Sequence, residues 1–88
     1  MSYVLRLTKR AVKDLERLDL TTARRIRRRL QELASDPLDH FLSYSLEMER
    51  DKRSSRVGDW RILYQVKESE NLIEVLAIAP RGRAYRKL

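Results

Sequence analysis

The side chains in this sequence that are best suited to chemistry are arginines. Fifteen of the twenty basic residues are arginine, against thirteen acidic residues, and the formal net charge is +7. The planar guanidinium group donates hydrogen bonds in a fork that matches phosphate oxygens and guanine edges better than a lysine ammonium group does. The charge concentrates in the first 36 residues, around Arg56 and Arg61, and in the C-terminal tail. Nucleic acid is therefore the expected partner, because a membrane-binding helix needs a larger apolar face.

The groups that the sequence lacks restrict the mechanism of any phosphodiester cleavage. There is no cysteine, and the one histidine, His40, is expected to be solvated in a loop, so neither a zinc cluster nor a histidine-dependent triad is expected. No local pair of carboxylates predicts two-metal chemistry. Cleavage would depend on positioning and on Arg or Lys stabilising charge at phosphorus, a route that suits RNA because its 2′-hydroxyl attacks the adjacent phosphate. We therefore predict a site without metal or cofactor.

Two of the arginines are expected to meet across a hairpin in the middle of the chain. Alternate residues of a strand share a face, so Lys52, Ser54 and Arg56 point the same way. Residues 58–59, a Gly-Asp pair, predict a tight turn, and Arg61 follows on the next strand. Cross-strand neighbours lie close together, which predicts that Arg56 and Arg61 converge.

Three further features have both a structural and a functional interpretation. The arginine run at residues 24–29 is most simply a solvated helix face, and it also suits electrostatic anchoring on ribosomal RNA or on an acidic partner. Trp60 more often packs into a core than stacks on a base. In the tail, Arg81 and Arg83 suit phosphate, and Tyr85 either anchors the segment or stacks on a base.

Hydrophobic periodicity predicts the elements that position these residues. Residues 3–7 predict a first strand, after which Thr8 caps a helix. Thr21 or Thr22 caps a second helix, which ends before Pro37. The expected buried stripes are Ala11, Val12, Leu15 and Leu18 in the first helix, and Ala23, Ile26, Leu30, Leu33 and Ala34 in the second.

The second half of the chain predicts strands. Residues 38–50 predict an irregular connection that leads into the strand before the turn. Residues 60–66 are rich in aromatic and β-branched residues and residues 72–79 are mostly apolar, so both predict strands. The 88 residues form one domain, residues 1–88. The order β-α-α-β-β-β predicts an α+β fold in which an N-terminal helical hairpin packs on a small, mainly antiparallel, four-stranded sheet. With no membrane span, signal peptide or cysteine, the expected location is the cytoplasm.

These stretches resemble the RelE branch of the RelE/ParE toxin superfamily, in its archaeal form. Residues 3–18 look like the family's opening strand and helix, and residues 56–64 (RVGDWRILY) look like its RxGD(Y/W)RxxY hairpin. Residues 80–85 (PRGRAY) are similar to the tail of archaeal members. The resemblance implies a microbial-ribonuclease-like fold and a toxin that cleaves mRNA in the ribosomal A site through 2′-hydroxyl attack, without metal. It also implies a RelB-like antitoxin that binds the toxin in a hetero-oligomer.

The resemblance further implies roles for individual residues. Arg61 matches the family's central phosphate-contacting arginine, and Arg81 or Arg83 matches its C-terminal arginine. The implied catalytic residues are Arg61, Arg81, Lys52 and Tyr85, and the implied substrate-binding residues are Arg56, Arg83 and Arg53. The family usually has a basic residue at the position of Ser54, so we expect Ser54→Lys to raise cleavage by pointing into the same pocket.

Two other functions are compatible with the same residues. A ParE-like toxin would inhibit DNA gyrase without cutting, and Ser54 favours this alternative. A degenerate toxin, or a plain RNA-binding domain, would only bind RNA. Arg61 and the basic tail favour the nuclease, whose expected partners are mRNA, the ribosome with its rRNA, and the antitoxin, and not a membrane.

Overall fold

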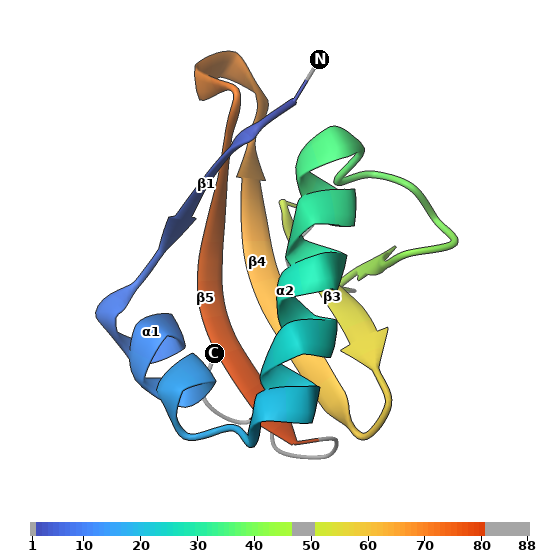
Figure 1. The fold of residues 1–88 in the computed structure, drawn as a ribbon. Helices are drawn as coiled ribbons and strands as arrows, with labels where there is room; N and C mark the ends of the chain where they lie inside the picture. Colours follow the sequence, from blue (N-terminus) through green and yellow to red (C-terminus); the bar gives the residue numbers. More distant parts are fainter. Residues whose placement is uncertain (1, 47–50, 81–88) are drawn as a thin grey trace.

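The computed structural model describes residues 2–46 and 51–80, and these form two helices, five strands and a short 3₁₀ turn. In chain order the elements are β1 (Val4–Leu7), α1 (Lys9–Glu16), α2 (Leu20–Ser35), β2 (Tyr44–Ser45), β3 (Lys52–Val57), β4 (Trp60–Lys67), η1 (Glu68–Glu70) and β5 (Leu72–Pro80). Figure 1 shows α2 lying across one face of the sheet, with α1 beside the C-terminal half of β5. The predicted α+β class and helical hairpin are confirmed.

The sheet has the strand order β1-β5-β4-β3-β2. Strands β3, β4 and β5 form an antiparallel meander, in agreement with the predicted mainly antiparallel sheet, whereas β1 pairs in parallel with β5. The predicted count of four strands is wrong for the described residues, because Tyr44 and Ser45 pair with the outer edge of β3 and make a short fifth strand. This pairing gives hydrogen-bond partners to an edge that would otherwise be bare.

The first helix buries a narrower stripe than the sequence predicts. Thr8 caps α1 as expected, its side chain accepting a hydrogen bond from the backbone N–H of Ala11. Ala11 is fully buried and Leu15 packs against the core, but Val12 is 41% exposed, so its predicted burial is wrong. Successive helical residues point about 100° apart around the helix axis. A helix of two turns that lies beside the sheet therefore buries only the side that faces the sheet.

The second helix carries the predicted apolar stripe except at Ala34, which is half-buried, and it begins at a different cap. Its buried residues are Ala23, Ile26, Leu30 and Leu33. The cap is Asp19, and not Thr21 or Thr22, because the Asp19 carboxylate accepts a hydrogen bond from the Thr22 backbone N–H at 3.1 Å. The Thr22 hydroxyl also donates to this carboxylate and, as the main cause, holds the pKa of Asp19 below its usual value.

The two faces of the sheet bury different residues. On the helix-covered face, Ile26 and Leu33 of α2 meet Ile62 and Tyr64 of β4 in the main core, and all four are fully buried. The opposite face, here called the far face, carries a smaller apolar cluster that consists of Leu63, Ala77 and Ala79 with Leu46 packed on it. Neither helix of the described residues is long and apolar enough to cross a membrane.

Candidate functional site

Arg56 and Arg61 face each other across the β3–β4 hairpin. They are direct partners in the strand register, on either side of a turn in which Gly58 adopts a φ of 60°. Glycine adopts this left-handed backbone conformation at little cost in free energy, and the resulting turn matches the twist of the two strands. Arg56 is exposed and Arg61 is half-buried, and both lie on the far face. The prediction that the two arginines are cross-strand neighbours on one face is therefore confirmed.

Tyr44 of β2 orients the guanidinium group of Arg61. The Nη1 atom of Arg61 donates a hydrogen bond to the Tyr44 hydroxyl at 3.0 Å, and its guanidinium carbon lies 5.9 Å from the centre of the Tyr44 ring. Tyr44 also pairs with Ser54 in the register, which places it on the far face. The sequence interpretation missed Tyr44, since only the register of β2 on β3 brings this tyrosine to Arg61.

An open groove of about 370 Å³ lies beside this arginine pair. It is lined by Arg29, His40, Phe41, Leu42, Ser43, Tyr44, Arg56 and Arg61. The lining combines guanidinium groups with aromatic rings, which is the chemistry that meets phosphates and bases in single-stranded nucleic acid. His40 is exposed, as expected, but it belongs to the wall of the groove and does not stand apart from the arginines.

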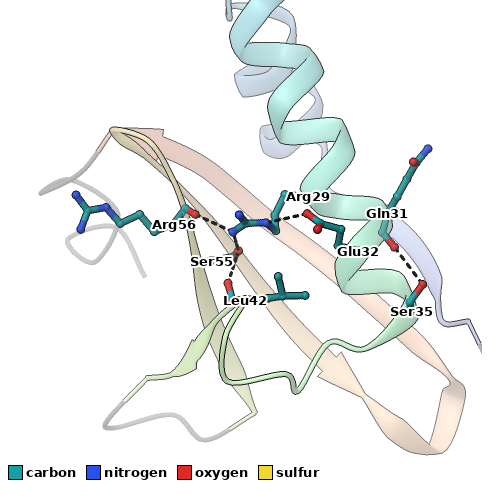
Figure 2. Close-up of polar contacts among 7 residues, drawn as sticks. All are labelled: Arg29, Gln31, Glu32, Ser35, Leu42, Ser55 and Arg56. Carbon is teal, nitrogen blue, oxygen red and sulfur yellow. Dashed lines mark hydrogen bonds and ion pairs between the residues drawn. The ribbon is translucent and has the colours of Figure 1, made fainter.

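Arg29 joins α2 to the strand that carries Arg56 (Figure 2). Its Nη1 atom donates to the Ser55 hydroxyl at 2.9 Å and to the backbone carbonyl of Arg56 at 2.8 Å, while its Nε atom binds Glu32 at 3.1 Å. Ser55 in turn donates to the carbonyl of Leu42 at 2.7 Å. The last arginine of the run thus ties the helix, β3 and the groove wall together.

The other arginines of the run behave as the simpler interpretation predicts. They are exposed on α2, at positions 24, 25, 27 and 28. The Arg25 guanidinium reaches over the hairpin turn, within 3.3 Å of the position that a Cβ on Gly58 would occupy. Trp60 packs against the main core, which confirms the packing interpretation.

A buried hydrogen-bond network fixes the segment from residue 37 to residue 43, of which residues 40–43 form one wall of the groove. The Tyr64 hydroxyl donates to the carbonyl of Pro37 at 2.6 Å and hydrogen-bonds the Ser43 hydroxyl at 2.6 Å. Arg53 adds bonds from its Nε atom to the Ser43 hydroxyl at 2.9 Å and from its Nη2 atom to the Ser43 carbonyl at 3.1 Å. Burial raises the pKa of Tyr64, against the opposing effect of its hydrogen bonds to Ser43 and Arg53.

The structure separates the implied site residues into three groups. Arg56 and Arg61 lie together, and Lys52 shares their face but stands four residues along β3 from Arg56, about 13 Å away. Arg53 faces the helices, where it holds the groove wall, so the structure does not bring it to the arginine pair. Arg81, Arg83 and Tyr85 lie outside the described residues. Strand β5 ends at Pro80, which pairs with Trp60 one position from Arg61.

Ser54 is buried and its hydroxyl has no hydrogen-bond partner among the described residues. A lysine at this position would have to displace what covers it, which does not agree with the expectation that Ser54→Lys simply extends into the site. The neighbouring Ser55 is equally buried but makes hydrogen bonds with both Arg29 and Leu42. The two serines therefore form a matched pair that differs in hydrogen bonding.

Ser54→Ala is expected to leave the free energy of unfolding unchanged or to raise it by about 1 kcal/mol, because it removes an unsatisfied buried hydroxyl. Ser55→Ala is expected to lower it by about 1 to 3 kcal/mol, because the partners of that hydroxyl lose a hydrogen bond. Urea unfolding of both variants, followed by circular dichroism, measures the difference. Equal losses in the two variants would contradict this assignment.

No group of three or more His, Asp or Glu side chains within residues 2–46 and 51–80 is arranged to hold a metal ion. The polar groups of the described site are cations and a hydroxyl: the guanidinium groups of Arg56 and Arg61, the ammonium group of Lys52 and the phenol of Tyr44. Such groups bind phosphate oxygens and stabilise negative charge that develops on them.

Solved structures with this fold define the class of protein. The chain is 31% identical to a chain of the archaeal RelE–RelB complex from Pyrococcus horikoshii OT3, with a TM-score of 0.80 over 94% of this chain and 99% of that one. A chain of the Mycobacterium tuberculosis RelBE2 toxin–antitoxin complex is 24% identical, with a TM-score of 0.80 and coverage of 92% and 100%. A chain of the intact Escherichia coli RelBE complex is 21% identical, with a TM-score of 0.82 and coverage of 93% and 100%. The molecule is a small toxin with the RelE fold.

The family follows from the sequence itself. The model of the ParE toxin family of type II toxin–antitoxin systems matches residues 5–85. The chain belongs to this family, and hence to the RelE/ParE superfamily of type II toxins. No curated protein sequence matches the chain significantly.

Proposed function

We propose that this toxin is a ribosome-dependent endoribonuclease that cleaves mRNA in the ribosomal A site. The observation that carries the proposal is the pairing of Arg56 and Arg61 on the far face, with the Arg61 guanidinium held against the Tyr44 hydroxyl. An oriented guanidinium pair binds the scissile phosphate and stabilises the charge that develops on its oxygens. The resemblance to RelE toxins supports the same conclusion.

In the proposed reaction the 2′-hydroxyl of the RNA attacks its own adjacent phosphate. The 2′-oxygen gives up its proton as it bonds to phosphorus, and the bond from phosphorus to the 5′-oxygen of the next nucleotide breaks. The leaving 5′-oxygen takes up a proton, so a 2′,3′-cyclic phosphate and a 5′-hydroxyl end are formed. Arg61 holds the phosphate, and Arg81 and Lys52 are further catalytic cations. Tyr85 is the tail tyrosine that stacks on the substrate or deprotonates it. Arg56 binds the same phosphate beside Arg61, and Arg83 binds the flanking backbone. The ribosome orients the message, because in-line geometry supplies much of the rate in such a displacement.

A RelB-like antitoxin is the proposed partner in the cell. The similar chains from Pyrococcus horikoshii, Mycobacterium tuberculosis and Escherichia coli were solved in RelB–RelE or RelBE complexes. A formal net charge of +7 and the exposed arginines of α2 suit an acidic segment of such a protein. We infer that the toxin acts in the cytoplasm, where it meets both the antitoxin and ribosomes.

Primer extension on a translated message tests the nuclease proposal. The expected result is new 5′ ends within codons when the toxin and ribosomes are both present, and an intact message when purified RNA is mixed with the toxin alone. Arg25→Ala, on the exposed face of α2, serves as a variant outside the site and is expected to cut as the wild type does. Equal cleavage without ribosomes contradicts the ribosome dependence.

The second candidate function is inhibition of DNA gyrase without cleavage of RNA. Two observations favour it: the match to the ParE family model, and the buried Ser54 at a position where RelE toxins usually have a basic residue. Supercoiling assays with purified gyrase separate the two functions. Intact message ends together with relaxed or broken DNA would support gyrase as the target and reject the nuclease.

A further inference from the structure

The fold leaves the ring of Phe41 almost entirely in water. Phe41 is 86% exposed, more than any other large hydrophobic residue in the part of the chain that the structure describes. Because the ring is exposed, its burial adds little to the free energy of unfolding, whereas a phenylalanine in the core would add as much as other large core residues do. Removing its ring is therefore expected to leave the fold intact, which makes the residue accessible to experiment.

The backbone that carries Phe41 is held in place by a turn built on Asp39. The Asp39 carboxylate accepts a hydrogen bond from the Phe41 N–H at 2.9 Å, and the Asp39 carbonyl accepts from Leu42 at 3.0 Å and from Ser43 at 3.1 Å. The carbonyl of Leu42 is bound in turn by Ser55. The exposed ring thus stands on a main chain with defined hydrogen bonds to β3.

The His40 ring stacks against the Phe41 ring. The two ring centres are 4.2 Å apart and the planes are inclined by 35°. Both residues line the same groove as Arg56 and Arg61, which brings a pair of rings and a pair of guanidinium groups to one cavity of about 370 Å³. Ring faces stack on bases, while guanidinium groups bind the phosphates between them.

We propose that His40 and Phe41 form a stacking platform for one base of single-stranded RNA, next to the phosphate that Arg56 and Arg61 hold. The inference rests on the proposed ribonuclease function and adds residues that determine how the substrate is recognised. A single-stranded nucleotide suits the groove because it presents a flat base and a negative phosphate a few ångströms apart. Every base has a stacking face, so the platform acts on affinity and biases base choice only through stacking strength.

The charge of the groove favours RNA over an apolar peptide. The lining includes three arginines, Arg29, Arg56 and Arg61, and an apolar helix would bury these positive charges without supplying an anion. An acidic peptide of the antitoxin is the remaining protein candidate, and the experiment below distinguishes it from RNA. If this peptide and not RNA occupies the groove, Phe41→Ala weakens peptide binding while RNA binding stays unchanged.

The direct test uses a short single-stranded RNA that carries one 2-aminopurine, whose fluorescence falls when the base stacks on an aromatic ring. The wild-type protein is expected to quench the probe on binding. Phe41→Ala is expected to lose the quenching and to raise Kd by about tenfold, as for the loss of one base–aromatic stack. Phe41→Trp is expected to keep both, and Phe41→Leu is expected to behave as Phe41→Ala does.

Leu38→Ala is the matched control, since Leu38 is an exposed apolar residue of the same connection that does not line the groove. It is expected to bind and quench as the wild type does. The platform is overturned if Phe41→Ala quenches normally, or if Phe41→Leu retains wild-type affinity, since a plain apolar contact would then suffice. Loss of affinity for an acidic antitoxin peptide alone would overturn it as well.

A second measurement separates this inference from the proposed function. On ribosomes programmed with mRNA, Phe41→Ala is expected to raise KM and to change the distribution of cut sites while kcat stays within a few-fold of wild type. A wild-type protein that quenches the RNA probe but never cuts would reject the nuclease and keep the platform. A wild-type protein that cuts mRNA, but whose Phe41→Ala variant has an unchanged KM and unchanged cut sites, would reject the platform alone.

Discussion

Arg61→Ala is expected to lower the rate of mRNA cleavage on ribosomes by about a hundredfold or more. In the proposed mechanism the guanidinium group of Arg61, which Tyr44 orients, stabilises the transition state at the scissile phosphate by a few kcal/mol, and alanine removes that interaction entirely. The measurement is single-turnover cleavage of a message on purified ribosomes, with growth arrest in cells as the second readout. Arg81→Ala is expected to have a similar effect.

The fold should survive this substitution, because Arg61 is half-buried on the far face and lies outside the main core. A thermal melt of the purified variant checks that point. Arg61→Lys is informative as well: it keeps the charge but loses the planar fork, so it is expected to restore only part of the rate. Normal toxicity of Arg61→Ala at normal abundance would remove Arg61 from the site.

Tyr64→Phe is expected to lower the free energy of unfolding by about 1 to 3 kcal/mol, and Tm by roughly 5 to 15 °C. The lost hydroxyl leaves the carbonyl of Pro37 and the hydroxyl of Ser43 without their 2.6 Å partner inside the core. Differential scanning calorimetry measures the change. Tyr3→Phe, at a half-buried tyrosine packed on the same core, is the control and is expected to change stability by no more than about 0.5 kcal/mol.

The same tyrosine predicts a loss of stability in alkali. Because burial raises the pKa of Tyr64 in the folded state, the unfolded chain releases this proton first as the pH rises. The contribution of protonated Tyr64 to the free energy of unfolding is fully present below the ordinary pKa of tyrosine, near 10. It is lost as the pH rises from there through the folded-state pKa. Stability of Tyr64→Phe should therefore decline less steeply above pH 10 than that of the wild type. Parallel curves for the two proteins would contradict this linkage.

Tyr64→Phe also reports on the site through the groove wall. The Tyr64 hydroxyl is bonded at both ends of the segment that carries His40 and Phe41, at Pro37 and at Ser43. Loosening this segment is expected to raise KM for ribosome-bound mRNA more than it lowers kcat, because Arg61 itself is untouched. The final residue of the RVGDWRILY hairpin thus acts on the site as a structural support.

The amino-acid sequence alone determined the features that depend on local geometry. The buried stripe of α2, for example at Ile26 and Leu33, follows from the helical period. The facing of Arg56 and Arg61 follows from strand alternation and from a glycine at the turn, where φ is 60°. These rules involve neighbours only a few residues apart, so backbone geometry determines them without reference to distant parts of the chain.

Only the tertiary structure decided which distant side chains complete the site. Tyr44 reaches Arg61 because β2 pairs with β3 in one register, and His40 and Phe41 reach the groove because Tyr64 and Arg53 hold the connection. The sequence interpretation assigned Arg53 to substrate, although its strand face points at the helices. The physical reason is that an irregular connection has no period: its path is set by the buried polar groups that it must satisfy, and those lie on strands elsewhere in the chain.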